Sequence, residues 1–422
     1  MEKLEITKIE GLEILDSRGY PTVQAKVTLR CGAQGIASVP SGASTGKYEA
    51  YELRDKSQER YGGKGVMRAV ENIEKIITPA LLGIRANDSS RVDHIMIALD
   101  GAHNKSNLGA NTILSVSLAV AKAAAAALRI PLYRYLGGYT RNRLPVPMMN
   151  IINGGLHASN GLDIQEFMIL PIGASSFGEG VRMCAEIYQA LKAGLTAKGL
   201  SVAVGDEGGF APALKEDAEA IEAILTAIHH VGCDCKKDVM LGLDIASGGW
   251  YENGEYTLPK QNKKMTHDAL IHHYKSLCAQ FPILSIEDGL AEDDIAGWKK
   301  LTHELGREHL LVGDDLFVTN VERLELGIQE GIANTILIKP NQIGTLTETA
   351  AAISLAKKNG YKVILSHRSG ETADTAIADM AVAFGADFIK SGAPCRSERC
   401  EKYNRLLAIE NEMFSPAYSY FN

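Results

Sequence analysis

Short apolar runs recur through the second half of the chain, and each ends in a charged residue or a histidine. The later runs follow one another at intervals of 23 to 28 residues, with helical patterns such as 348–360 between them. Apolar strands that alternate with helices predict a parallel sheet covered by helices, and in a closed barrel the strand ends converge on one mouth. The residues at these strand ends are Asp244, Glu287, Asp314, Lys339, His367 and Lys390.

The first part of the chain has a different, mixed pattern. Residues 4–9 and 22–29 alternate apolar and polar positions, which predicts antiparallel strands on either side of a turn at 16–19. Helical patterns follow at 64–82 and 109–128, and a stretch rich in glycine and proline follows at 137–147. We therefore predict an α/β protein, with a small α+β capping domain at 1–138 and a (β/α)₈-type barrel at 139–422 that carries the catalytic residues.

Composition narrows the possible functions. The net charge of −7 and the lack of a basic stripe argue against a nucleic-acid partner. The stretch 113–130 is interrupted by Lys122 and rich in alanine, so we expect a buried helix there and no membrane span. The N-terminus lacks the apolar core of a secretory signal, and the seven cysteines show no paired spacing, which together favour a cytoplasmic location.

The charged strand ends indicate metal-dependent chemistry on an anionic substrate. Three carboxylates, from Asp244, Glu287 and Asp314, offer the hard oxygen ligands that Mg²⁺ prefers. The alternative is that neighbouring lysines neutralise these acids, but a divalent cation would relieve their repulsion better. Lys339 or Lys390 could bind an anion. Alternatively, one of them could act as a base, because nearby Mg²⁺ and a second ammonium lower the pKa of a lysine.

The segment 367–370 places a guanidinium and a hydroxyl in one tight turn. Arg368 and Ser369 are therefore suited to bind a phosphate or a carboxylate, the alternative being an arginine held in a salt bridge. Removal of a proton next to a carboxylate builds up negative charge, and a bound metal can stabilise that charge by several kcal/mol. This is the reaction class that the set of strand ends favours.

With these segments identified, the chain closely resembles the enolase family over nearly its whole length. The resemblance implies reversible dehydration of 2-phosphoglycerate to phosphoenolpyruvate, a lyase reaction of glycolysis and gluconeogenesis. It also implies the α+β domain and the barrel, with the first barrel strands antiparallel, and a homodimer or higher homo-oligomer. The matching stretches include 16–22, 39–55, 99–111, 145–158, 163–169, 203–212, 285–290, 312–320, 338–349 and 366–372.

The resemblance also implies a role for individual residues. Asp244, Glu287 and Asp314 match the ligands of a first Mg²⁺, and Ser44 matches a ligand of a second Mg²⁺ that joins once substrate is bound. Lys339 matches the base that takes the C2 proton. The other matching residues are Glu207 as the acid at the C3 hydroxyl, Glu166 as its carboxylate partner, and His157, His367, Arg368, Ser369 and Lys390 as substrate-binding groups.

Some positions depart from the family pattern. Gly248, Gly249 and Trp250 stand where family members commonly have Ser-Glu-Phe, and Ala373 replaces an acid. These changes lie near the expected mouth of the barrel, where small displacements affect activity. The segment 248–250 favours a rival hypothesis, a diverged paralogue with the same Mg²⁺ site and lysine base that acts on another phospho- or phosphono-carboxylate. The intact set of Ser44, His157, Glu166, Glu207 and Arg368 disfavours this rival. A third hypothesis is a non-catalytic binding protein on the same fold, which the complete set of acids, base and ligands disfavours.

Overall fold

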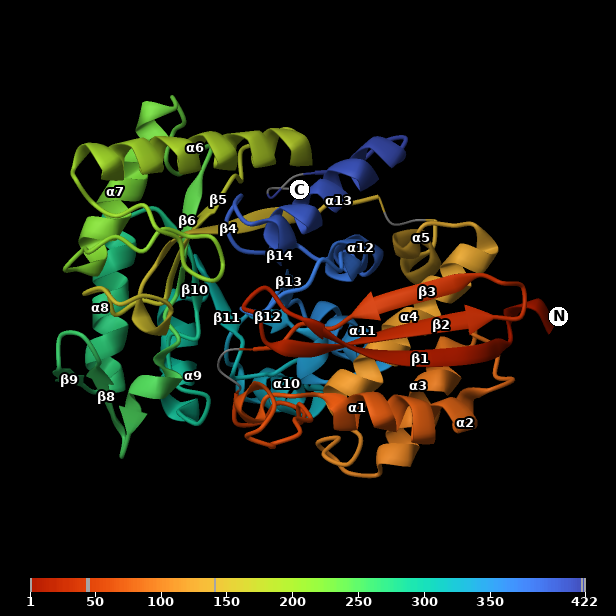
Figure 1. Cartoon of the computed structure of the whole chain (residues 1–422). Helices are drawn as coiled ribbons and strands as arrows, with labels where there is room; N and C mark the ends of the chain where they lie inside the picture. Colours follow the sequence, from red (N-terminus) through yellow and green to blue (C-terminus); the bar gives the residue numbers. More distant parts are fainter. Residues whose placement is uncertain (1, 43–45, 140–141, 419, 421–422) are drawn as a thin grey trace.

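The computed structural model describes residues 2–42, 46–139, 142–418 and 420. An N-terminal sheet with helices packed on it lies beside a closed barrel surrounded by helices, as Figure 1 shows. The C-terminal helix lies on the outside of the barrel (Figure 1). The two parts correspond to the mixed first pattern and the regular second pattern of the sequence.

The N-terminal sheet has three antiparallel strands, β1 (Ile6–Leu15), β2 (Pro21–Leu29) and β3 (Gln34–Ser38). The predicted hairpin at its start is confirmed, although β1 continues to Leu15, beyond the predicted end of the strand. Asp16 forms the turn, because its Oδ1 accepts the backbone N–H groups of Arg18 at 2.8 Å and Tyr20 at 2.9 Å. An aspartate that binds the backbone two residues further on is a common device in turns.

Helix α4 (Ala110–Leu128) packs against strands β2 and β3. The helix is long and apolar enough to cross a membrane, but 78% of its most apolar window is buried inside the protein, which confirms the predicted core helix. A Cβ atom on Gly35 of β3 would lie 2.1 Å from the carbonyl oxygen of Ala119, so this close packing requires a glycine. The other helices here are α1 (Met67–Asn72), α2 (Thr78–Leu81), α3 (Ser89–Asp100) and α5 (Leu132–Gly137), with a π-helical segment at Ile73–Ile77 between α1 and α2.

The barrel closes in the strand order β10-β11-β12-β13-β14-β4-β5-β6. All six apolar runs predicted from the sequence are barrel strands, and they pair in parallel with their neighbours among them. Strand β5 runs antiparallel to both of its neighbours, as the family resemblance implies for the start of the barrel. The strands are β4 (Val146–Asn153), β5 (Glu166–Leu170), β6 (Met240–Asp244), β10 (Ile283–Glu287), β11 (Leu310–Gly313), β12 (Thr335–Ile338), β13 (Lys362–Ser366) and β14 (Phe388–Lys390).

Helices cover the outside of the barrel, and side-chain caps fix where several of them begin. Thr345, for example, accepts the backbone N–H of Glu348 at 3.1 Å, while the carboxylate of Glu348 accepts the hydroxyl of Thr345 at 2.6 Å. The helices are α6 (Phe177–Ala197), α7 (Asp217–His230), α8 (His267–Gln280), α9 (Ile295–Leu305), α10 (Val321–Glu330), α11 (Leu346–Lys358), α12 (Ala376–Ala383) and α13 (Ser397–Glu412). A small sheet of β7 (Tyr251–Glu252), β8 (Glu255–Leu258) and β9 (Lys263–Met265) follows β6.

One apolar cluster of buried side chains comes almost entirely from the barrel strands. It includes Met148, Met168, Val312, Leu337 and Phe388, each from a different strand. Such a packed interior makes the barrel a core rather than a pore, so charged side chains gather only where the strands end.

Candidate active site

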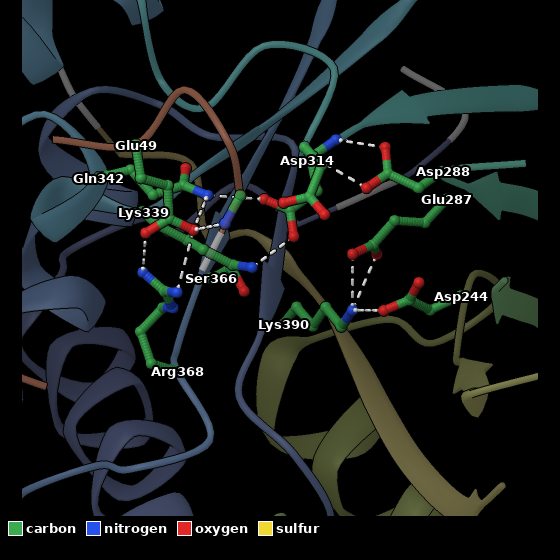
Figure 2. Close-up of polar contacts among 12 residues, drawn as sticks. Glu49, Asp244, Glu287, Asp288, Asp314, Lys339, Gln342, Ser366, Arg368 and Lys390 are labelled. Atoms are coloured by element: carbon green, nitrogen blue, oxygen red, sulfur yellow. Dashed lines mark hydrogen bonds and ion pairs between the residues drawn. The ribbon is translucent and has the colours of Figure 1, made fainter. Parts of the chain in front are cut away.

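The strand-end residues predicted from the sequence surround one pocket at the C-terminal mouth of the barrel. Asp244, Glu287 and Lys390 end their strands, and Asp314, Lys339 and His367 directly follow theirs. Figure 2 shows five of these six residues pointing toward one another. Glu287 is fully buried beside the pocket, and Ser44 lies outside the described residues. The pocket is lined by Glu49, His157, Gln165, Glu166, Glu207, Asp244, Ala246, Asp288, Asp314, Asp315, Lys339, Ser366, His367, Arg368, Ser369 and Lys390.

Lys390 lies among three carboxylates. Its Nζ is 2.8 Å from both carboxylate oxygens of Glu287 and 3.0 Å from one oxygen of Asp244 (Figure 2). It also lies 3.0 Å from one oxygen of Glu166. Burial disfavours the charged form of Lys390, but the surrounding carboxylates outweigh burial and raise its pKa well above the ordinary value. Burial, and then the charge of Asp244, raise the pKa of Glu287 well above its ordinary value. One ammonium is therefore shared by more carboxylates than it can neutralise.

Lys339 forms an ion pair with Asp314, whose other oxygen accepts the side-chain amide of Gln342 at 3.0 Å (Figure 2). Burial opposes the charged form of Asp314, but Lys339 outweighs it and lowers the pKa of Asp314. Burial also opposes the charge on Lys339, yet Asp314 raises its pKa. This direction is opposite to the lowered lysine pKa expected from the sequence, because a carboxylate lies directly against the ammonium.

Lys339 and Lys390 thus form ion pairs with the three predicted acids without balancing all of their charge. Two groups of side chains bring ligand atoms within 4.8 Å of one another and could hold a metal ion. They are His157, Glu166 and Glu207, and Asp288, Asp314 and Asp315. Within the described part of the chain, the predicted set of Asp244, Glu287 and Asp314 does not converge as closely as these two.

Two histidines and two glutamates form a chain across the pocket. His157 Nδ1 lies 3.6 Å from Glu166 and 4.0 Å from Glu207, and His367 Nε2 lies 3.7 Å from Glu207. Burial and the nearby charge of Glu207 raise the pKa of Glu166 to about 8, against the opposing effect of Lys390. Burial, and then the charge of Arg399, lower the pKa of His367 well below its ordinary value. At neutral pH the site therefore contains a protonated carboxyl group and a neutral imidazole.

Arg368 is held in a salt bridge, the alternative that the sequence left open. Its guanidinium contacts both oxygens of Glu49, at 3.0 and 3.1 Å, and donates to Asn341 Oδ1 at 3.1 Å. Arg399 supports the backbone of the same turn, because it donates to the carbonyl oxygens of Arg368 and Ser369, both at 2.6 Å. Arg368 and Ser369 therefore lie in one turn at the mouth, and the guanidinium of Arg368 contacts a carboxylate of the protein itself.

Sequence reasoning missed four residues that shape the site, namely Glu49, Asp288, Gln342 and Arg399. Asp288 accepts the backbone N–H groups of Asp314 at 2.9 Å and Asp315 at 2.8 Å, and so fixes the end of β11. Its position directly after Glu287 was the one available signal. Arg399 is fully buried although it lies in the highly charged helix α13, where the sequence pattern gives no sign of burial.

The closed barrel, with acids, lysines and an arginine gathered at its strand ends, defines a TIM-barrel enzyme. The family model described as "Enolase, C-terminal TIM barrel domain" matches residues 141–420, and "Enolase, N-terminal domain" matches residues 6–136. The chain therefore belongs to the enolase family, a family of lyases. Two proteins named "Enolase 2", from Pseudomonas syringae pv. syringae (strain B728a) and pv. tomato (strain ATCC BAA-871 / DC3000), are each 56% identical to it over 417 residues. Each match covers 99% of this chain and 98% of the relative.

Proposed function

We propose that this protein catalyses the reversible, Mg²⁺-dependent dehydration of 2-phosphoglycerate to phosphoenolpyruvate. The observation that carries the proposal is the set of acids, lysines and an arginine at one mouth of the barrel, in a chain of the enolase family. The family also supports a role in glycolysis and gluconeogenesis, a cytoplasmic location and a homodimer or higher homo-oligomer.

The residues at the mouth fit a divalent metal. Asp244, Glu287 and Asp314 offer only oxygen ligands, the type that Mg²⁺ prefers. The strongly raised pKa of Glu287 reflects burial and repulsion among these acids, which a divalent cation would relieve. We assign the first Mg²⁺ to these three residues, and a second ion, bound with substrate, to Ser44. A metal bound at this mouth would stabilise the negative charge that develops on the substrate carboxylate.

Lys339 is our candidate for the base that removes the proton from C2. A lysine can accept a proton only in its neutral form, and the ion pair with Asp314 favours the charged form. The contact between Lys339 and Asp314 must therefore break before proton transfer. Burial of Lys339 then favours its neutral form, since burial alone lowers the pKa of an ammonium.

Glu207 and Glu166 are our candidates for assisting the loss of the C3 hydroxyl. A leaving hydroxide needs a proton, and the raised pKa of Glu166, about 8, keeps one proton on this carboxyl pair at neutral pH. We assign the donor role to Glu207, with Glu166 as its partner. We assign His157, whose Nδ1 lies 3.6 Å from Glu166 and 4.0 Å from Glu207, as a substrate contact beside them.

Arg368 and Ser369 are our candidates for binding the phosphate, with His367 and Lys390 as further substrate contacts. Arg368 is buried and presents the planar donors that suit a phosphate. Lys390 pairs with the acids around it and would attract the substrate carboxylate once a metal takes over some of these acids.

One observation favours the rival substrate. A cavity of about 460 Å³ lies next to the active-site pocket and shares Gln165, Ala246 and Asp315 with it. Gly248 and Gly249 line this cavity, and a Cβ atom on Gly249 would meet no heavy atom within 4 Å. The space left by this glycine could accept a larger phospho- or phosphono-carboxylate.

Formation of phosphoenolpyruvate from 2-phosphoglycerate, followed by ultraviolet absorbance, tests the proposal. We expect turnover with Mg²⁺ that EDTA abolishes, and loss of turnover in Lys339→Ala. Lys358→Ala, an exposed lysine at the end of α11, is the matched control and should keep full activity. Absent turnover in folded wild-type protein that still binds Mg²⁺ would overturn the proposal. Turnover of a larger phosphonocarboxylate that Gly249→Glu removes would then establish the rival.

A further inference from the structure

The carboxylate of Glu49 pairs with the guanidinium of Arg368, the group that we assign to phosphate binding. Its two oxygens lie 3.0 and 3.1 Å from the two terminal nitrogens of Arg368, in a fork-to-fork pair (Figure 2). Both side chains are buried, with 3% of Arg368 and 6% of Glu49 exposed. A two-point pair shielded from water is much stronger than an ion pair on the surface.

Glu49 is held in this position by its own segment and by the barrel. Its Oε1 accepts the backbone N–H of Gly46 at 2.9 Å and the side-chain amide of Gln342 at 3.3 Å. The next residue, Ala50, donates its N–H to the carbonyl oxygen of Gln342 at 2.8 Å. Because these contacts fix the carboxylate against Arg368, the pair is a built feature of the folded chain.

A phosphate and Glu49 cannot both bind Arg368 through the same two nitrogens. Two anions side by side would also repel each other in a buried site, while a buried guanidinium without any counter-ion is costly. Binding of a phosphate therefore requires an exchange, in which the ligand takes over the guanidinium and the Glu49 carboxylate leaves it.

We propose that Glu49 is an internal anion that competes with the phosphate group of the ligand for Arg368 and so sets the affinity of the site. The inference rests on the proposed role of Arg368. A competitor within the chain lowers the apparent affinity for every anion at this site by one common factor, the fraction of protein in which Arg368 is released. Glu49 thus sets how tightly any anion binds at this site, while the relative affinities of different anions stay the same.

The exchange of Glu49 for a phosphate at Arg368 also affects Lys339, the proposed base. Gln342 contacts Glu49 and Asp314 through the same side-chain nitrogen, and Asp314 holds Lys339. When Glu49 leaves Arg368, Gln342 loses one of its two acceptors. Occupation of the phosphate site therefore changes the hydrogen bonding of the carboxylate that pairs with the base.

Calorimetric titration of the metal-free protein with inorganic phosphate at pH 8 tests this proposal. We expect Glu49→Gln to bind phosphate about tenfold more tightly than the wild type, which corresponds to about 1.4 kcal/mol. Sulfate should gain the same factor as phosphate. Glu52→Gln is the matched control, because Glu52 pairs with Arg54 and acts on Arg368 only through its charge. Its phosphate affinity should change by less than about twofold.

Equal or weaker phosphate binding by Glu49→Gln would overturn the proposal, as would a gain in Glu52→Gln as large as that in Glu49→Gln. If Glu49→Gln does not fold, Glu49→Asp takes its place. Its shorter side chain cannot keep both contacts, so we expect intermediate tightening, and unchanged binding again overturns the proposal. Because the titration needs no turnover, failure of the activity assay refutes the proposed reaction without deciding the role of Glu49.

Discussion

The buried carboxyl group of Asp217 leads to a specific prediction of how the free energy of unfolding depends on pH. Asp217 begins helix α7, is 8% exposed, and accepts the backbone N–H groups of Asp163 at 3.1 Å and Ile164 at 3.2 Å. Burial raises its pKa from 3.8 to about 7, against the opposing hydrogen bond from Ile164 and with support from the charge of Asp163. The folded protein therefore keeps a proton on Asp217 that the unfolded chain releases in mild acid.

This difference in the pKa of Asp217 between the folded and unfolded states determines the sign and size of the pH effect on stability. Because the folded state binds the extra proton, the contribution of Asp217 to stability is complete below pH 3.8 and is lost as the pH rises through about 7. The shift of about 3 pKa units corresponds to about 4 kcal/mol in total, at 1.36 kcal/mol per unit. Between pH 5 and pH 8 the loss is about 3 kcal/mol.

Urea unfolding of the wild type and of Asp217→Asn between pH 5 and pH 8 measures this contribution. The amide keeps an oxygen for both backbone donors but has no charge, so the variant should gain about 3 kcal/mol relative to the wild type as the pH rises. Glu222→Gln, an exposed carboxylate on the same helix, is the control and should show no such gain. A stability difference between Asp217→Asn and the wild type that stays within about 0.5 kcal/mol across this range would refute the reasoning.

Three further variants test other parts of the structure. Gly35→Ala should lower the free energy of unfolding by about 3 kcal/mol, because its methyl group would meet the Ala119 carbonyl at 2.1 Å; an unchanged urea midpoint contradicts this. Lys122→Ala should cost about 2 kcal/mol in the same assay, since it removes the 2.7 Å ion-pair partner of the half-buried Asp374. Arg399→Lys should reduce kcat/KM at least tenfold at unchanged helical content, because lysine cannot make the same set of donations; normal kinetics would exclude this positioning role.

Much of the fold could be predicted because the sequence pattern is local. A parallel strand buried on both faces needs a continuous apolar run, and the six runs from 239 to 390 all became barrel strands. The periodic pattern did not predict strands β4 and β5. The connection between them contains no long helix, and β5 runs against its neighbours, so the repeat of strand and helix begins only after them.

The site was predictable as a set of residues, because the topology of a barrel brings the strand ends together whatever lies between them. The partners of those residues were not predictable. Glu49 and Arg368 are 319 positions apart, and nothing near either residue marks the pairing. Arg399 is a similar case, since its burial depends on the packing of α13 against the barrel rather than on its own helix pattern.

Ligand binding and an internal salt bridge do not exclude one another for the charged residues at the mouth. From the sequence, the acids either bound a metal or were neutralised by lysines, and Arg368 either bound a phosphate or formed a salt bridge. The structure shows internal ion pairs for these residues, because buried charges need partners. The same need makes these pairs exchangeable, since a metal or an anionic substrate offers each residue a replacement partner. An internal salt bridge at this mouth is therefore compatible with a ligand-binding role for the same residue, and binding affinity measures the difference between the two partners.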